Sequence, residues 1–175
     1  STAWWFYSPD GSKVATGCGD GTTKLWNAQT GQELLTIPRQ DQDIRSVAFS
    51  RDGAQLLTGS YNGVVRLWDV ETGDEIRSFI GHASEVCEVD FSPDGTKILT
   101  GSCDQTAKLW DVQTGEVLRT FSGHEYGVYS SSFSADGSKI LTGDYQTVRM
   151  WDAQTGDCLR IFEGHTSFVF SVAFS

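Results

Sequence analysis

The chain has 175 residues, of which 38% are hydrophobic and 12% aromatic, a length and composition typical of one globular domain. Its net charge of −10 disfavours nucleic acid or an anionic membrane as the main partner, because both attract clustered Lys and Arg. No apolar run approaches the roughly 20 residues that span a bilayer, and the first residues lack the pattern of a secretory signal.

The predicted elements are short β-strands separated by turns. One stretch shows short strand-like runs between turn signals at 44–50, 55–58, 64–70 and 75–80. The dipeptides Asp20-Gly21 and Asn62-Gly63 suit tight hairpins, and Pro-Asp-Gly suits a type I turn. Four strands with turns every 8–12 residues leave little room for a helix.

The same short phrases return along the chain in one shared register. A Trp closes a phrase of the Lys-Leu-Trp-Asp kind at Trp26, Trp68, Trp110 and Trp151, spaced 42, 42 and 41 residues apart. An Asp-Gly phrase ends at Gly11, Gly53, Gly95 and Gly137, a Thr-Gly phrase at Gly31, Gly73, Gly115 and Gly156, and a Gly-His phrase at His82, His124 and His165. A period of about 42 is typical of a four-stranded propeller blade.

These phrases resemble those of the WD40 family, and the resemblance covers essentially the whole chain. It implies an all-β fold, a β-propeller segment of four four-stranded antiparallel blades within a single domain, 1–175. With the family's strand order, the blades span residues 2–37, 43–80, 85–122 and 127–163. Residues 168–175 then supply one extra C-terminal strand.

One group of residues in the third repeat has two interpretations. His82, Ser102 and Asp104 are the residue types of a hydrolase triad. The resemblance instead implies a buried structural tetrad of these three with Trp110, in which the indole N–H donates to the hydroxyl. No oxyanion hole or cleft is indicated, so we favour the tetrad and expect no catalytic residue.

The other repeats depart from the tetrad pattern. Gln40 stands where the second repeat would have its histidine, and the first repeat has no preceding Gly-His. The fourth repeat lacks one residue around Asp144. We therefore expect the complete tetrad only once, in the third blade.

Four cysteines, Cys18, Cys87, Cys103 and Cys158, form no CxxC pair and fall at different positions of the repeat. A disulfide framework or a zinc site is not expected, and the sequence predicts neither a metal site nor a cofactor. We expect the cysteines to behave as small apolar residues in a reducing compartment, the cytoplasm.

The resemblance implies a protein-protein interaction scaffold or recognition module, not an enzyme. In agreement, the sequence has no GxxxxGK[ST] phosphate loop and no HExxH motif. Two alternatives stay open, a regulatory arm of a larger signalling ATPase or kinase and a hydrolase with its site in the central channel.

The resemblance also implies a binding rim, formed by residues just after Gly-His and by the hairpin before the tetrad Asp. Its candidates here are Tyr61, Glu85, Glu88, Tyr126, Tyr129, Tyr145, Phe168 and Phe170, together with Cys103. Exposed aromatic rings suit a protein or peptide partner, because a rigid ring buries much area at low entropy cost. The alternative is that several of them pack into the central channel or between blades.

Four blades are about half of the seven or eight with which the family closes a ring. The remaining blades either belong to a longer parent chain or come from a second copy, giving a homodimer with an eight-bladed ring. An open half-ring leaves hydrophobic blade faces in water, which predicts association.

Overall fold

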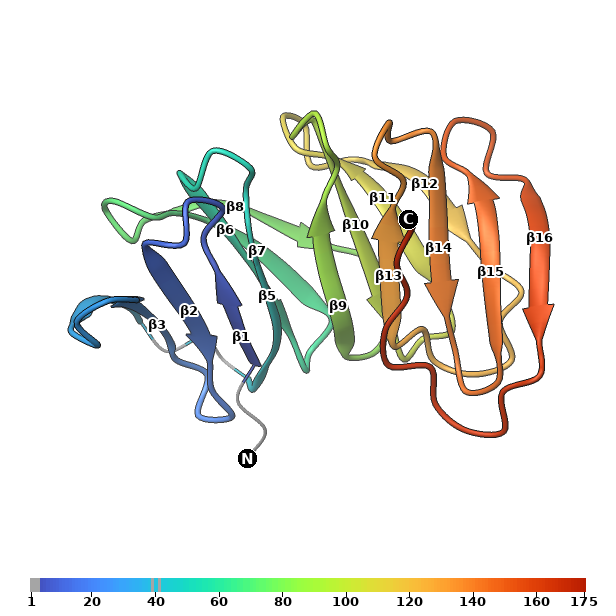
Figure 1. Ribbon diagram of the computed structural model, residues 1–175. Helices are drawn as coiled ribbons and strands as arrows, with labels where there is room; N and C mark the ends of the chain where they lie inside the picture. The colour runs from blue at the N-terminus through green and yellow to red at the C-terminus, as the bar shows by residue number, and fades with distance from the viewer. Residues whose placement is uncertain (1–3, 39, 41) are drawn as a thin grey trace.

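The computed structural model describes residues 4–38, 40 and 42–175, and this part of the chain consists of β-strands, turns and irregular segments. The strands form four sheets, each of four antiparallel strands that are neighbours both in sequence and in space. The sheets stand side by side in chain order (Figure 1), and the first strand of each contacts the first strand of the next. This confirms the predicted all-β class and the four blades.

The strands of each blade follow one another from the inner to the outer edge. Blade one consists of β1 (Trp4–Tyr7), β2 (Lys13–Gly17), β3 (Thr23–Asn27) and β4 (Glu33–Ile37). Blade two consists of β5 (Ile44–Phe49), β6 (Gln55–Ser60), β7 (Val64–Asp69) and β8 (Glu75–Ile80). Blade three consists of β9 (Val86–Phe91), β10 (Lys97–Ser102), β11 (Ala107–Asp111) and β12 (Val117–Phe121). Blade four consists of β13 (Ser130–Phe133), β14 (Lys139–Gly143), β15 (Thr147–Asp152) and β16 (Cys158–Glu163).

The turn between the first two strands of each blade is held by an aspartate. In blade three the Ser92 hydroxyl donates to Asp94 at 2.6 Å, and the backbone N–H of Thr96 donates to the same oxygen at 3.0 Å. The serine hydroxyl is the main cause that lowers the pKa of Asp94 to about 2. The same serine-to-aspartate bond recurs at Asp10, Asp52 and Asp136. These acidic residues are therefore part of the turns.

A glycine in the second strand of each blade lies directly against the start of the next blade. A Cβ atom at Gly59 would come within 2.9 Å of Val86 and 3.0 Å of Val89. The same approach recurs between the other blades, at Gly17 with Ile44 and at Gly101 with Val128. We call each of these contacts a glycine joint. Glycine is needed at the joint because a side chain would push the blades apart.

The hydrophobic core lies between blades. At each junction a hydrophobic residue packs against the repeated Trp of the following blade. This residue is the last or the last but one of an outer strand. The rings of Phe79 and Trp110 are 5.9 Å apart, and those of Phe121 and Trp151 are 5.5 Å apart. At the first junction Ile37 and Trp68 belong to the same buried cluster. Blade packing thus explains why the Trp recurs once per repeat.

The two end blades carry unmatched halves of this contact. Phe162 in β16 stands where blades two and three have Phe79 and Phe121, yet it is 44% exposed, whereas those two are 1% and 0% exposed. Trp26 in β3 is half-buried, while its counterpart Trp110 is 1% exposed. The open face of blade four therefore exposes the ring of Phe162, and the open face of blade one exposes part of the Trp26 indole.

The predicted extra strand at residues 168–175 is not observed as a strand. The segment lies along the inner edge of blade four (Figure 1), where the Val169 N–H donates to the Asp144 carbonyl and the Ser130 hydroxyl donates to the Val169 carbonyl. Val169 meets Gly143 in a fourth glycine joint. The segment is thus docked like the first strand of a blade, but none of the described strands pairs with it.

Candidate functional site

The predicted tetrad of blade three exists, with one member changed. The His82 ring lies with Nδ1 2.7 Å from Asp104 Oδ2 and Nε2 2.7 Å from Thr100 Oγ1. The Trp110 indole N–H donates to the same Thr100 hydroxyl at 2.9 Å. The tetrad is therefore His82, Thr100, Asp104 and Trp110, and the assignment of Ser102 was wrong.

Strand register explains the correction. Trp110 stands opposite Ile98, and Thr100 lies two residues farther along the same face of β10. Ser102 is four residues from Ile98, about 13 Å along a strand, which is beyond the reach of the indole. Its hydroxyl donates instead to the Ser84 carbonyl at 3.2 Å and accepts from the Asp104 N–H at 3.1 Å.

Blade four contains a second complete tetrad, which the sequence did not predict. His124 lies 2.8 Å from Asp144 Oδ2 and 2.6 Å from the Thr142 hydroxyl, to which the Trp151 indole donates at 2.7 Å. The missing residue shortens only the hairpin, so Asp144 begins a tighter turn and still reaches the histidine. Burial is the main cause that lowers the pKa of His124.

The remaining blades keep the bond between Trp and Thr and vary the rest. Trp26 donates to Thr16 at 2.9 Å, and Trp68 donates to Thr58 at 3.0 Å. In blade two the Thr58 hydroxyl donates to Gln40 Oε1 at 3.0 Å, so Gln40 occupies the place of the histidine. Its buried Nε2 has no hydrogen-bond partner among the described residues.

The tetrad geometry does not match a hydrolase triad. Both nitrogens of His82 are engaged, by Asp104 and by Thr100. Thr100 and Ser102 are both 0% exposed, so neither hydroxyl can meet a substrate. A nucleophile must be reachable by the bond that it attacks, and these residues instead serve as buried hydrogen-bond partners.

Five of the predicted rim residues form one continuous aromatic cluster, which we call the aromatic rim: Tyr126, Tyr129, Tyr145, Phe168 and Phe170. The ring centroids of Tyr145 lie 5.1 Å from Tyr126 and 4.8 Å from Phe168. Phe168 in turn lies 5.0 Å from Tyr129 and is stacked on Phe170 at 5.5 Å. Phe170 is 71% exposed, so the cluster reaches solvent.

A charged group continues the surface from blade three to blade two. The Arg45 guanidinium lies 5.3 Å from the centre of the Tyr61 ring and 3.3 Å from Glu85 Oε2. Tyr61 is 52% exposed. Arg45 was not among the predicted rim residues, although it connects two that were, Tyr61 and Glu85.

A repeated β-bulge brings the inner rim residues together. In blades two and three the first two strands shift register, which leaves Arg45 and Cys87 without a partner residue opposite. Arg45, Cys87, Tyr129 and Phe170 recur at intervals of 42, 42 and 41 residues, and with Glu85 they line a pocket of about 130 Å³. Extending the repeat register to these positions would have identified Arg45 from the sequence.

Glu88 is placed differently from the other candidates. It lies within β9 opposite Gly101 and is half-buried. Burial, with the nearby Asp90 carboxylate as a smaller cause, raises the pKa of Glu88 to about 8.

Comparison with known proteins identifies the repeat. The family model described as WD domain, G-beta repeat matches residues 2–27, 31–69, 73–111, 115–152 and 156–175, which together make up most of the chain. Each of the three central matches begins with the outer strand of one blade and continues into the first three strands of the next. No curated protein was found that matches this chain.

Proposed function

Because the chain belongs to the WD40-repeat family, we propose that it is an interaction module that holds a protein or peptide partner against the aromatic rim. The observation that carries this proposal is the continuous cluster of five rings that forms the aromatic rim. Rigid rings that share an exposed surface supply contact area at low entropy cost and are common among binding hot spots.

The charge balance supports a protein partner rather than nucleic acid. The net charge is −10, and Arg45, the basic residue beside the rim, is already engaged by Glu85 and Tyr61. A phosphate backbone binds tightly where several available Lys or Arg side chains displace its counterions. A chain with this charge balance lacks that source of affinity. The four free cysteines fit the cytoplasm as the place of action.

The proposal is tested with peptides selected from a random display library on the folded wild-type chain. Substitutions Tyr126→Ala and Tyr145→Ala should each weaken binding of the selected peptides by about tenfold or more, the loss typical of an aromatic hot spot. The matched control is Tyr7→Ala, because Tyr7 is also an exposed tyrosine but ends β1 and lies outside the aromatic rim. Equal binding by all three variants would contradict the proposal.

We also propose that the two open faces are covered by further WD40 blades and that a second copy of the chain supplies them. The exposed Phe162 and the half-buried Trp26 are the two halves of the contact seen at inner junctions. Because these halves lie at opposite ends of one chain, two copies placed head to tail would complete both contacts in an eight-bladed ring.

A further inference from the structure

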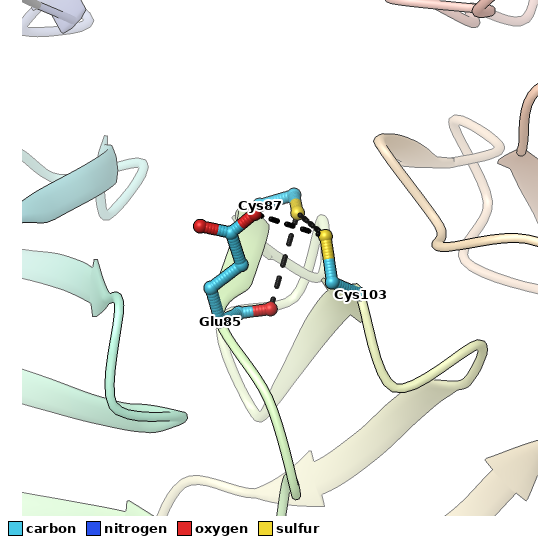
Figure 2. A group of neighbouring side chains, drawn as sticks. All are labelled: Glu85, Cys87 and Cys103. Carbon is cyan, nitrogen blue, oxygen red and sulfur yellow. Dashed lines mark hydrogen bonds between the residues drawn. The ribbon is translucent and has the colours of Figure 1, made fainter.

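A carboxylate and two thiols converge at the inner end of blade three, as Figure 2 shows. The sulfur atoms of Cys87 and Cys103 lie 3.2 Å apart, and the Cys103 sulfur lies 3.1 Å from Glu85 Oε1. One donor atom from each residue can be chosen so that all three lie within 4.8 Å of one another. We call these residues the Glu-Cys-Cys cluster.

The fold explains why residues without a metal-binding spacing meet here. Cys87 is the extra residue of the β-bulge in β9, and a bulge turns its side chain away from the regular alternation. Cys103 follows the end of β10, where its backbone N–H donates to the Glu85 carbonyl at 2.9 Å. Strand pairing thus brings together cysteines that lie sixteen positions apart in the sequence.

We propose that the Glu-Cys-Cys cluster binds a thiophilic divalent cation of the zinc type. Two sulfurs and one carboxylate oxygen are a donor set suited to Zn²⁺, whereas Mg²⁺ and Ca²⁺ require oxygen donors alone. The site goes beyond the protein contact proposed at the aromatic rim but adjoins it, because Tyr129 and Phe170 of that rim line the pocket beside the cluster.

The distances are close to those that such an ion requires. With Zn–S bonds of about 2.3 Å and tetrahedral angles, two sulfur ligands lie about 3.8 Å apart. The sulfurs at 3.2 Å therefore need to separate by about half an ångström when the ion replaces the thiol hydrogens. Since one of them sits on a bulge and the other in a hairpin, neither movement has to break a regular strand.

The charges also balance. On ion binding both thiols become thiolates, and with Glu85 the three donors carry three negative charges. A divalent ion and the Arg45 guanidinium, whose Nη2 lies 3.3 Å from Glu85 Oε2, compensate them. Arg45 holds that oxygen on one side and leaves Oε1, the oxygen nearer the sulfur, for the ion. Glu85 and Cys87 also line the pocket of about 130 Å³, from which a water molecule can supply the fourth ligand of a tetrahedral ion.

The test is a titration of the reduced chain with Co²⁺, a spectroscopic substitute for Zn²⁺. We expect about one Co²⁺ per chain, a sulfur-to-cobalt charge-transfer band, and loss of that band when Zn²⁺ is added. Cys87→Ser and Cys103→Ser should each weaken binding by at least about tenfold, and Glu85→Gln should do so while both sulfurs remain. Cys18→Ser and Cys158→Ser are the matched controls and should bind like the wild type.

A second measurement on the wild type avoids dependence on variants that fold poorly. Zn²⁺ should slow alkylation of Cys87 and Cys103, followed by mass spectrometry, and leave the exposed Cys158 unaffected. The proposal is overturned if the reduced chain gives no charge-transfer band, if Cys87→Ser binds Co²⁺ as tightly as the wild type, or if Zn²⁺ protects no cysteine. Recovery of a Cys87–Cys103 disulfide that resists reductant and excludes Co²⁺ would overturn it as well.

Discussion

At the scale of single residues, the constant feature of the repeat is a hydrogen bond from an indole to a threonine hydroxyl. It joins Trp26 to Thr16, Trp68 to Thr58, Trp110 to Thr100 and Trp151 to Thr142. An indole N–H can only donate, so a Trp buried between blades requires an acceptor within its own blade. The threonine hydroxyl is also bonded to a histidine in blades three and four and to Gln40 in blade two. The second partner of the threonine therefore varies, whereas the bond from the Trp is constant.

Replacing Thr100 with valine should therefore destabilise the chain more than removing the Ser102 hydroxyl. Thr100→Val keeps the shape of the side chain but leaves both the Trp110 N–H and the His82 Nε2 without a partner. Each buried polar group that loses its hydrogen bond destabilises the folded state by about 1–3 kcal/mol. The free energy of unfolding in urea measures the difference.

Ser102→Ala is the matched control for that experiment. Its bonds to Ser84 and Asp104 are near the upper limit of hydrogen-bond distance, so we expect a loss of about 1 kcal/mol or less. A larger loss for Ser102→Ala than for Thr100→Val would mean that the hydroxyl of the tetrad is Ser102 after all.

The stability of blade four should depend on pH through His124. Burial lowers the pKa of this imidazole below the ordinary 6.5, although Asp144 acts in the opposite direction. The unfolded chain therefore binds the proton more readily, so the contribution of His124 to stability is present above about pH 6.5 and is lost as the pH falls through the folded-state pKa.

We expect the free energy of unfolding of the wild type, relative to that of His124→Gln, to decline from about pH 7 to pH 5; this variant copies Gln40 of blade two. The buried Glu88, whose pKa is raised to about 8, acts in the opposite direction in both proteins, so the difference between them isolates His124. Urea denaturation followed by tryptophan fluorescence measures both curves. His165→Gln, at an exposed histidine, should keep the pH dependence of the wild type. Parallel curves for His124→Gln and the wild type would show that this histidine does not control the effect.

Sequence reasoning located the Trp, His and Asp positions of the tetrad but chose the wrong hydroxyl. Thr100 and Ser102 lie on the same face of β10, and only the pairing of Ile98 with Trp110 shows which of them is within reach. The second tetrad was missed for a related reason, because a one-residue deletion can be absorbed by a hairpin without moving Asp144 away from His124.

At the scale of elements, the glycine joints decide how closely blades pack. The repeated phrases predicted the four strands of each blade, and their turns follow directly from Asp-Gly and Thr-Gly chemistry. The joints were not predicted, because the sequence does not show which residue of the next blade lies against a strand glycine. At Gly59, for example, that residue is Val86. The same holds for the Glu-Cys-Cys cluster, which depends on a bulge.

Gly59→Ala should weaken the junction between blades two and three. An added methyl group would lie 2.9 Å from Val86 and 3.0 Å from Val89, so the blades must shift, at a cost of about 1–3 kcal/mol. Chemical denaturation measures this loss.

Gly19→Ala provides the comparison, because the closest atom to its new methyl group lies 3.7 Å away. We expect a change within about 0.5 kcal/mol, which is typical of a surface substitution. If the two alanine variants unfold at the same urea concentration, the glycine joints do not set the blade spacing.

At the scale of the whole molecule, the unmatched end faces predict self-association. Light scattering of the folded chain should give about twice the mass of one 19.2 kDa chain, as expected for a closed ring of two copies. Phe162→Asp should return it to a monomer, because a carboxylate cannot be buried against the indole of Trp26 without a partner.

Ile80→Asp tests whether any charge on an outer strand has that effect. Ile80 follows Phe79 in β8 and is 75% exposed at a junction that is already filled, so this variant should remain a dimer. A soluble, folded wild-type monomer would contradict the proposed dimer and favour blades supplied by a longer chain.

The sequence repeat and the structural blade are offset by one strand, and this offset has an evolutionary consequence. A matched unit such as 73–111 contains β8 of blade two and the first three strands of blade three. Duplication or loss of one such unit changes the number of blades by one, yet every blade remains composed of strands from two units. Recombination can therefore lengthen or shorten the array in whole steps, while each inherited unit still ties two neighbouring blades together through the peptide chain itself.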